Sequence, residues 1–288
     1  MADAAVVLFN GISYGMLLFI ITVGLSVTMG MMRFINLAHA TFAMVGGYTL
    51  ISFFYWLGVP YFASLALAFI VTALVSAILE RVLFQWFYGT DDLPQVLLTL
   101  GIIFMSIATV SYFWGPAFQP VPTPGWLTGR VTILGFNVES YRVFLFVIGI
   151  AIAALMIGGL EYTRFGAMVR ACVDNQRAAS GSGLNPKLVF AVTFAIGGGL
   201  AGLGGALSAG ILGLDPNYPL RYLVYILIIL SLGGMGTISG TLLAAILIGI
   251  VDVAGKYYLP SFGGFMVYIV AVIIMFARPQ GLLGRAGG

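Results

Sequence analysis

The sequence predicts an all-α integral membrane protein with eight or nine transmembrane or re-entrant helical segments. Hydrophobic residues make up 61% of the 288 residues, whereas charged residues make up only 7%. A soluble domain needs far more charge on its surface, so this composition is typical of a polytopic membrane protein. The apolar residues also fall into long runs, and nothing suggests a second, soluble domain. We therefore expect one transmembrane domain over residues 1–288.

The apolar runs give the order of the expected segments. A helix needs about 20 residues to cross the hydrocarbon core of a bilayer. The seventh run is clearly shorter than this, and we interpret it as a half-helix or as part of a re-entrant element. The nine runs cover residues 6–30, 38–57, 60–83, 94–114, 141–160, 188–212, 221–233, 237–258 and 262–277.

Basic residues predict the orientation of these segments. Cytoplasmic loops are enriched in lysine and arginine, and the stretch 161–187 carries three arginines and one lysine. If all nine segments cross, this stretch and the C-terminal tail lie in the cytoplasm and the N-terminus lies outside. The proline-rich segment 115–140, which is unsuited to a transmembrane helix, then also lies outside. The net charge of +3 thus reports orientation and does not indicate nucleic-acid binding.

The stretch 161–187 has the pattern of a short amphipathic helix. Its apolar side chains recur at i, i+3, i+4, i+7 and i+8, and they are Phe165, Met168, Val169, Cys172 and Val173. Serine and glycine at 180–183 end this helix, and Asn185 followed by Pro186 favours the start of the next one. The simplest alternative is a solvated connector whose apolar stripe rests on lipid headgroups.

A second polar interruption, residues 30–48, separates the first two apolar runs with almost no linker. It contains Arg33, Asn36 and His39. Such groups are expensive in a membrane, roughly 3 kcal/mol for an arginine at the centre of a helix. One interpretation is a tight turn at the cytoplasmic interface, in which Asn36 caps the following helix. The other is a broken helix whose unwound backbone faces a transport pathway.

Two glycine-rich stretches lie further along the chain. Small residues recur every fourth position at Gly198, Gly202, Ala206 and Gly210, a spacing that favours close helix packing, with a narrow pathway as the alternative role. Residues 232–240, LGGMGTISG, form a second break between a short run and a longer one. Paired breaks in the two halves of a transporter point to a central pathway.

The membrane-embedded acids and bases form no catalytic cluster. Asp252 and Lys256 are spaced i, i+4 with the acid first, which predicts an ion pair on one helix face. Glu80 and Arg81 are adjacent and point in different directions on a helix, so we expect separate partners at the cytoplasmic boundary.

The motifs of nucleotide-binding and hydrolytic enzymes are also missing. The chain has no GxxxxGK[ST] loop, so we do not expect it to bind ATP in the P-loop manner. It has no HExxH motif, and His39 is its only histidine. We therefore expect no metal site, no cofactor and no enzyme activity in this chain, which leaves a membrane-embedded enzyme without a catalytic centre.

Several stretches resemble one known family. RACVDNQRAASGSGLN, residues 170–185, resembles the cytoplasmic loop of bacterial ABC importer permeases. FINLAHATFAMVGGY, residues 34–48, closely resembles the INxAHG…GxY signature of the Liv-type permeases, and ARPQGLLGR near the C-terminus also matches. The chain is identified as a member of this Liv-type ABC transporter permease family, closest to its LivH-like subunits. Ala40 departs from the family pattern, which usually has glycine at that position.

The resemblance implies a function and a set of partners. Liv-type permeases carry branched-chain amino acids and related solutes into bacteria across the cytoplasmic (inner) membrane. The expected partners are a second, related permease subunit in a heterodimer, two cytoplasmic ATPase subunits that use ATP and Mg²⁺, and a periplasmic or lipid-anchored solute-binding protein. The chain itself then contacts membrane lipid, binds no ATP, and forms half of the translocation pathway.

Two groups of residues are the candidate sites. In the family, an alanine-rich helix that ends in a glycine–hydrophobic pair docks into a groove on the ATPase. The matching coupling residues here are Arg164, Phe165, Gly166, Met168, Val169, Arg170, Cys172, Asp174, Arg177, Ala178, Ala179 and Gly183. The pathway residues that we predict from the two breaks are Asn36, His39, Thr41, Gly46, Gly47, Gly233, Gly234 and Gly236.

Two alternatives to this function stay open at the level of sequence. Urea, short amides and organic acids are carried by similar permeases, so the solute is not fixed by the resemblance. An ion- or proton-coupled secondary transporter would need acids deep in the membrane, whereas Glu80 and Asp252 fall toward the ends of their predicted segments.

Overall fold

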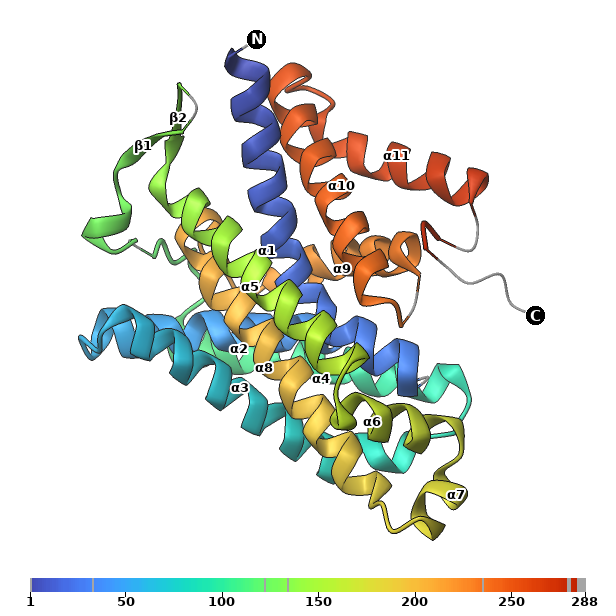
Figure 1. Ribbon diagram of the computed structural model, residues 1–288. Coiled ribbons are helices and arrows are strands. Elements are labelled where there is room, and N and C mark those ends of the chain that lie inside the picture. Colours follow the sequence, from blue (N-terminus) through green and yellow to red (C-terminus); the bar gives the residue numbers. More distant parts are fainter. Residues whose placement is uncertain are drawn as a thin grey trace.

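A computed structural model describes residues 2–32, 34–121, 123–133, 135–234, 236–278 and 281–283 (Figure 1). Within these residues, six helices are long and apolar enough to cross a membrane. They are α1 (Ala2–Met32), α3 (Tyr61–Val82), α4 (Asp92–Trp114), α5 (Ser140–Glu161), α8 (Pro186–Leu212) and α10 (Ile238–Tyr258). The predicted all-α, multi-pass membrane fold is confirmed at this level.

Shorter helices occupy the other three apolar runs. The helix α2 (His39–Leu50) continues as a π-helical turn over Ile51–Trp56. The helices α9 (Tyr218–Gly233) and α11 (Gly263–Ala277) have 16 and 15 residues. These lengths fall short of the roughly 20 residues that span a bilayer core. The predicted seventh run is thus short, and the number of segments that cross stays a prediction.

The proline-rich segment between α4 and α5 contains a short β-hairpin, which departs from the predicted all-helical chain. After a 3₁₀ turn over Gly125–Leu127, the strands β1 (Arg130–Ile133) and β2 (Phe136–Glu139) pair antiparallel. Gly135, in the turn between them, has a φ of +85°, a region that glycine enters without steric cost. This hairpin agrees with the expectation that the segment is not a membrane helix.

The helix α8 is the central packing element, because it contacts α1, α2 and α3. Asn185 caps its start by accepting a hydrogen bond from the Leu188 amide at 3.2 Å, and Pro186 follows, as the sequence predicts. A methyl group built on Gly202 would overlap the side chain of Thr72 on α3, and one on Gly205 would overlap the backbone of Ala43 on α2. The small residues of α8 therefore serve close helix packing, which confirms the first of the two predicted roles.

A second close contact joins α1 to α10. A methyl group on Gly15 would lie 2.6 Å from the Ile246 Cα, and one on Gly11 would lie 2.7 Å from the Ile250 Cα. Since Gly11 faces the later residue and Gly15 the earlier one, the two helices run antiparallel. Figure 1 shows α1 between α10 on one side and α5 on the other. The start of α1 therefore lies at the same end of the molecule as the end of α10.

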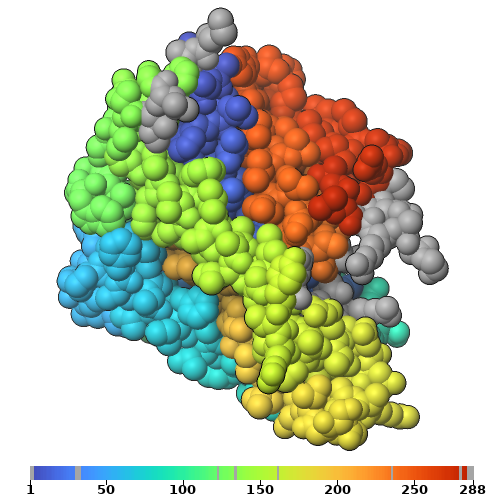
Figure 2. Space-filling view, in the orientation of Figure 1, coloured from blue at the N-terminus to red at the C-terminus, as the bar shows by residue number. Residues whose placement is uncertain are grey.

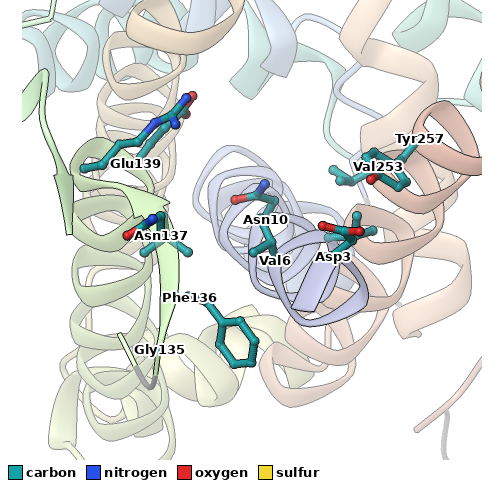
Figure 3. A pocket seen from close by; sticks show the side chains of 12 residues that line it. Asp3, Val6, Asn10, Gly135, Phe136, Asn137, Glu139, Val253 and Tyr257 are labelled. Carbon is teal, nitrogen blue, oxygen red and sulfur yellow. The ribbon is translucent and has the colours of Figure 1, made fainter. Parts of the chain in front are cut away.

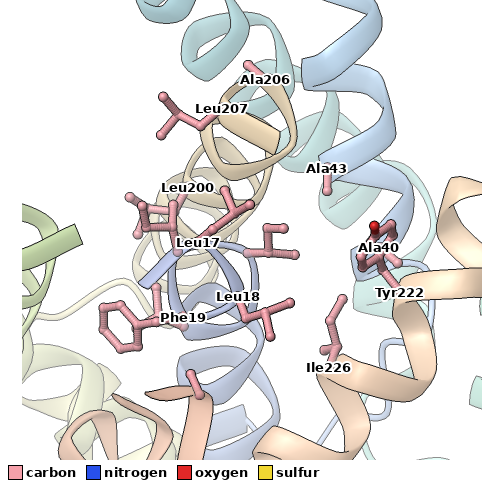
Figure 4. Close-up of a cluster of buried hydrophobic side chains, with 14 of the residues drawn as sticks. Leu17, Leu18, Phe19, Ala40, Ala43, Leu200, Ala206, Leu207, Tyr222 and Ile226 are labelled. Atoms are coloured by element: carbon pink, nitrogen blue, oxygen red, sulfur yellow. The ribbon is translucent and has the colours of Figure 1, made fainter. Parts of the chain in front are cut away.

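The apolar core lies where α1, α2, α8 and α9 meet (Figure 4). Leu17 and Leu18 of α1, Leu207 of α8 and Ile226 of α9 are all essentially inaccessible to solvent. Ala40, which replaces the family's usual glycine, is also fully buried in this cluster. The methyl group of Ala40 is thus accommodated in the core.

The two ends of the molecule differ in character. The hairpin lies beside the start of α1 and the end of α10, and Asp3, Asn137 and Tyr257 line one cavity there. The short helices α6 (Arg164–Asp174) and α7 (Gln176–Gly181) project from the opposite end, as the yellow-green part of Figure 2 shows. The predicted outside and cytoplasmic segments therefore occupy opposite ends of the fold.

Candidate functional site

The loop 161–187 is built from two capped helices, whereas the sequence predicts one. Thr163 caps α6 by accepting a hydrogen bond from the Gly166 amide at 3.4 Å. Asn175 then interrupts the helix, and its side chain accepts from the Ala178 amide at 3.0 Å to start α7. Asparagine competes for backbone hydrogen bonds in this way, which is why the chain turns here. Gly183, with a φ of +85°, provides the predicted stop.

The apolar stripe of this loop is buried inside the chain. Val169 and Cys172 are fully inaccessible, and they cluster with Ala179 of α7 and with Val189 and Phe190 of α8. The expectation that the stripe enters a groove on an ATPase, or rests on lipid, is therefore corrected for these two side chains. Amphipathic periodicity shows which face of a helix is buried but does not identify what buries it.

The rest of the predicted coupling set divides between the two faces of the loop. Phe165 and Met168 are half-buried at the edge of the cluster. Gly166 is buried and packs so closely on the Leu160 carbonyl that a methyl group there would overlap it. Arg170 Nη1 donates to that carbonyl at 2.5 Å, which ties α6 to the end of α5. The exposed face carries Arg164, Arg170, Asp174, Arg177 and Ala178. We call these five residues the outer face.

The first break is buried. The His39 Nε2 lies 3.0 Å from the Ile21 carbonyl oxygen of α1, and the Ile35 amide donates to Gln95 Oε1 of α4 at 2.8 Å. Thr41 Oγ1 lies 3.2 Å from Ser106 Oγ, also on α4. His39 is thus a packed, hydrogen-bonded residue within the described chain. Arg33, also predicted to matter here, lies outside the described residues.

Asn36 has a role that differs from the predicted cap. The N-cap residue of α2 is Ala38, whose methyl group cannot accept a hydrogen bond from the helix. Asn36 is completely buried, and neither its side-chain nitrogen nor its side-chain oxygen has a hydrogen-bond partner among the described residues. A buried amide without partners costs roughly 1–3 kcal/mol, so Asn36 does not stabilise this conformation through hydrogen bonds to the described residues.

The predicted pathway glycines are packing and turn residues in this structure. A methyl group on Gly46 would overlap the backbone of Gly202, and one on Gly47 would lie 2.6 Å from Leu214 Cδ1. Gly233 faces the backbone of Gly240 just as closely. Gly234 and Gly236 have φ values of +88° and +85°, which explains a glycine-rich turn there. Whether any of them contacts a solute stays a prediction.

The two breaks contact the same helix at different points. His39 contacts Ile21 of α1, whereas Thr241, just after the second break, donates to Ser26 Oγ of α1 at 2.8 Å. The second break also contacts the described tail, because the Leu282 amide donates to the Leu232 carbonyl at 2.6 Å. The part of α1 around residues 21–26 thus contacts both α2 and α10.

An aromatic cluster joins the first break to the loop 161–187. Phe34, at the break, contacts Tyr88 edge-to-face with ring centroids 5.6 Å apart, and Tyr88 contacts Phe190 of the loop cluster at 5.9 Å. Tyr88 also donates to Glu80 Oε1 at 3.0 Å. Burial, with the nearby Glu80 charge, raises the pKa of Tyr88, so its hydroxyl stays a donor at neutral pH. The sequence pattern did not predict this contact between distant segments.

The sequence predicts only part of a polar cluster between α9 and α10. The predicted pair is confirmed, because Lys256 Nζ lies 2.6 Å from Asp252 Oδ2. Tyr225 of α9 donates to the other carboxylate oxygen at 2.9 Å, and the ring of Tyr222 makes tilted contacts with Tyr225 and Tyr218. The i, i+4, i+7 spacing of these tyrosines is the sequence signal that could have revealed the cluster.

A polar cavity of about 540 Å³ opens at the hairpin end (Figure 3). Asp3 and Asn10 of α1 line it on one side, Glu139 of the hairpin on another, and Val253 and Tyr257 of α10 on a third. The cavity thus lies between α1, the hairpin and α10. Among the described residues, no group of three or more histidine, cysteine, aspartate or glutamate side chains could hold a metal ion.

Comparison with known proteins agrees with this architecture. The chain is 25% identical to the Escherichia coli K12 protein "High-affinity branched-chain amino acid transport system permease protein LivH", over 96% of this chain and 94% of that protein. It is 27% identical to the "Probable branched-chain amino acid transport permease protein LivH" of Methanocaldococcus jannaschii, over 96% of this chain and 92% of that protein.

A second type of relative is also similar. The Escherichia coli K12 permease protein LivM is 25% identical over 93% of this chain and 68% of its own length. No solved structure gives a significant match. Residues 7–277 match the family described as "Branched-chain amino acid transport system / permease component". Since the match covers nearly all of the helical core, the chain belongs to this family of transport permeases.

Proposed function

We propose that the chain is the membrane-spanning permease subunit of an ATP-driven ABC importer, and that its solute is a branched-chain amino acid. The observation that carries this proposal is the family match over residues 7–277, together with end-to-end similarity to proteins named LivH. The chain has no P-loop, so ATP and Mg²⁺ would bind to two separate ATPase subunits in the cytoplasm.

The orientation follows from the two ends of the fold. The basic loop of α6 and α7 would face the cytoplasm, and the hairpin with the cavity of Figure 3 would face outward. Aromatic side chains support an interface near the hairpin: Trp56 stacks on Trp114 at 6.2 Å, and Phe62 stacks on Trp126 at 5.4 Å. The membrane would be the bacterial cytoplasmic (inner) membrane.

The ATPase would dock on the outer face of the loop. Because Val169 and Cys172 are held inside the chain, the surface available to a partner consists of four charged side chains and, at its C-terminal end, Ala178. Small residues allow close approach of a partner, and arginines at the edge can pair with its acids. The buried stripe would fix the loop to α8, so that a load on the outer face reaches the membrane helices.

The aromatic cluster gives this load a physical route to the first break. A movement of the loop cluster would act on Phe190, which contacts Tyr88, and Tyr88 contacts Phe34. Phe34 is two residues from Asn36, whose buried amide lacks partners among the described residues. An amide that is unsatisfied in one conformation can be satisfied by solute, water or backbone in another. We therefore place Asn36 on the pathway.

The partners at the other end would be a second permease and a binding protein. The similarity to both LivH and LivM supports a heterodimer of related permeases. A periplasmic or lipid-anchored binding protein would deliver the solute near the polar cavity of Figure 3. Much of the solute specificity would then lie in that protein, so urea, short amides and organic acids remain alternative cargoes of the same machinery.

Uptake by the reconstituted transporter tests this function. Liposomes that contain the chain, its second permease and its ATPases should accumulate radiolabelled leucine only with internal ATP and the loaded binding protein. Excess valine should compete, and urea should not. Uptake that needs no ATP and collapses with a proton ionophore would instead identify a proton-coupled secondary transporter.

A matched pair of variants tests the docking face. Ala178→Glu places a charge on the exposed outer face, and Ala117→Glu places the same charge on the exposed loop at the opposite end. We expect the first variant to fold normally but to lose most of its ATPase in co-purification, and the second to retain it. Equal recovery with both variants would contradict docking on the outer face.

A further inference from the structure

A second cavity lies at the cytoplasmic end, outside the outer face of the loop. Its volume is about 690 Å³. The last turn of α3 and the 3₁₀ turn Phe84–Phe87 form one wall, through Glu80, Gln85 and Trp86. The starts of α7 and α8 form the other wall, through Gln176 and Lys187. The cavity is therefore an open groove between two turns that are far apart in sequence.

The floor of this groove carries a buried carboxylate that is only half satisfied. Glu80 is 1% exposed, and its Oε1 accepts from the Tyr88 hydroxyl at 3.0 Å. Its Oε2 has no hydrogen-bond partner among the described residues. The Nε of Arg81 is 3.7 Å away, beyond hydrogen-bonding distance, and the Arg81 side chain is 43% exposed. The expected separation of Glu80 from Arg81 is thus only partly correct, since a long ion pair remains.

A buried carboxylate with an oxygen that accepts no hydrogen bond attracts a charged donor. An ionised carboxylate accepts two parallel bonds from a guanidinium or one from an ammonium group, and such bonds are strongest in sites shielded from water. Trp86 is 74% exposed at the edge of the same groove, a position where tryptophan often anchors a protein partner. The groove thus combines an acid at its floor with an aromatic anchor at its rim.

We infer that this groove is a second docking point for the ATPase subunit, which inserts a lysine or arginine side chain toward Glu80. The inference rests on the proposed function. Two observations favour a protein partner over a free amine. Gln176 lines the groove and directly precedes Arg177 of the outer face, so an ATPase seated on that face reaches the groove. The groove is also open and far larger than one small cation.

Glu80→Gln tests this inference in the complete transporter. The glutamine keeps the shape and the oxygen that accepts from Tyr88, but it removes the charge. We expect roughly tenfold weaker ATPase association, as for the loss of one charge-assisted hydrogen bond. The matched control is Glu139→Gln, which neutralises an exposed acid at the opposite end and should not change the association.

A crosslinking measurement keeps the test independent of any effect on folding. A photoreactive amino acid at Gln85, with Glu80 intact, should crosslink to the ATPase next to a basic residue. Crosslinks only to lipid, or crosslinks suppressed by added free amino acid, would overturn the inference, as would unchanged association of the Glu80→Gln variant. If the wild-type chain recovers no ATPase at all, the proposed function fails first.

Discussion

Gly46 separates a packing role from a pathway role, and one substitution can decide between them. The sequence places Gly46 on the predicted pathway, whereas the structure presses it against the backbone of Gly202 on α8. The Cβ of an alanine at position 46 would overlap the Gly202 carbonyl oxygen and Cα. Because these are backbone atoms, the clash cannot be relieved by a side-chain rotation, and α2 must move away from α8.

The size of the effect follows from the nature of the clash. Overpacking a well-packed interior costs typically about 1–3 kcal/mol, and a clash with backbone belongs at the upper end. For a domain of 150–250 residues, each 1 kcal/mol shifts the melting temperature by about 2–4 °C, so we expect Gly46→Ala to lower it by roughly 6–12 °C. The measurement is thermal aggregation in detergent, followed by fluorescence-detected size-exclusion chromatography.

Gly101→Ala is the matched control. Gly101 also lies inside a helix, α4, but a methyl group there would meet nothing within 4 Å. Alanine is favoured over glycine in a helix by about 0.8–1 kcal/mol, so this variant should be as stable as the wild type or slightly more stable. If Gly46→Ala melts together with Gly101→Ala and yet abolishes uptake, the packing argument is refuted and Gly46 lines the pathway.

Three further predictions use single side chains. Cysteines introduced at Ser180 and Thr128 should react with impermeant maleimides from opposite sides of the membrane, and labelling from one side would overturn the orientation. Burial raises the pKa of Cys172, so its thiol should react slowly with maleimides at pH 7 and faster as the pH rises. Fast labelling at pH 7 would mean that α6 detaches from α8 and exposes the thiol. Asn36→Leu should lower uptake while assembly and thermal stability are kept, whereas normal uptake would make the break purely structural.

The sequence predicts the helices well because their signals are local. Apolar runs, a capping Asn185 and a positive-φ Gly183 act within a few residues, and the structure has helices and ends at these places. The split of the loop at Asn175 was missed because asparagine is tolerated within helices, and only its bond to the Ala178 amide makes it a cap.

The candidate sites were harder to predict because they depend on contacts between distant segments. Periodicity correctly found the apolar stripe that contains Val169, but the partner that buries it, α8, is a tertiary fact. The same holds for Glu80, whose partner Tyr88 lies eight residues away across a turn. The glycine-rich pattern was interpreted as part of a helix break, but Gly46 lies inside α2 and packs against Gly202 of α8.

These contacts indicate where the protein is stiff and where it can bend. The close contacts of α8 with α2 and α3, which involve the backbone of Gly46 and the side chain of Thr72, leave no room for sliding, so these helices should move as one body with the loop that is packed on α8. The contact of α1 with α10 is equally tight. The positive-φ glycines Gly234 and Gly236 lie between α9 and α10, and a hinge needs residues that can absorb backbone rotation. Because α1 packs closely on both α8 and α10, we expect a load on the loop 161–187 to pass through α8 and α1 to α10, with backbone rotation confined to the second break.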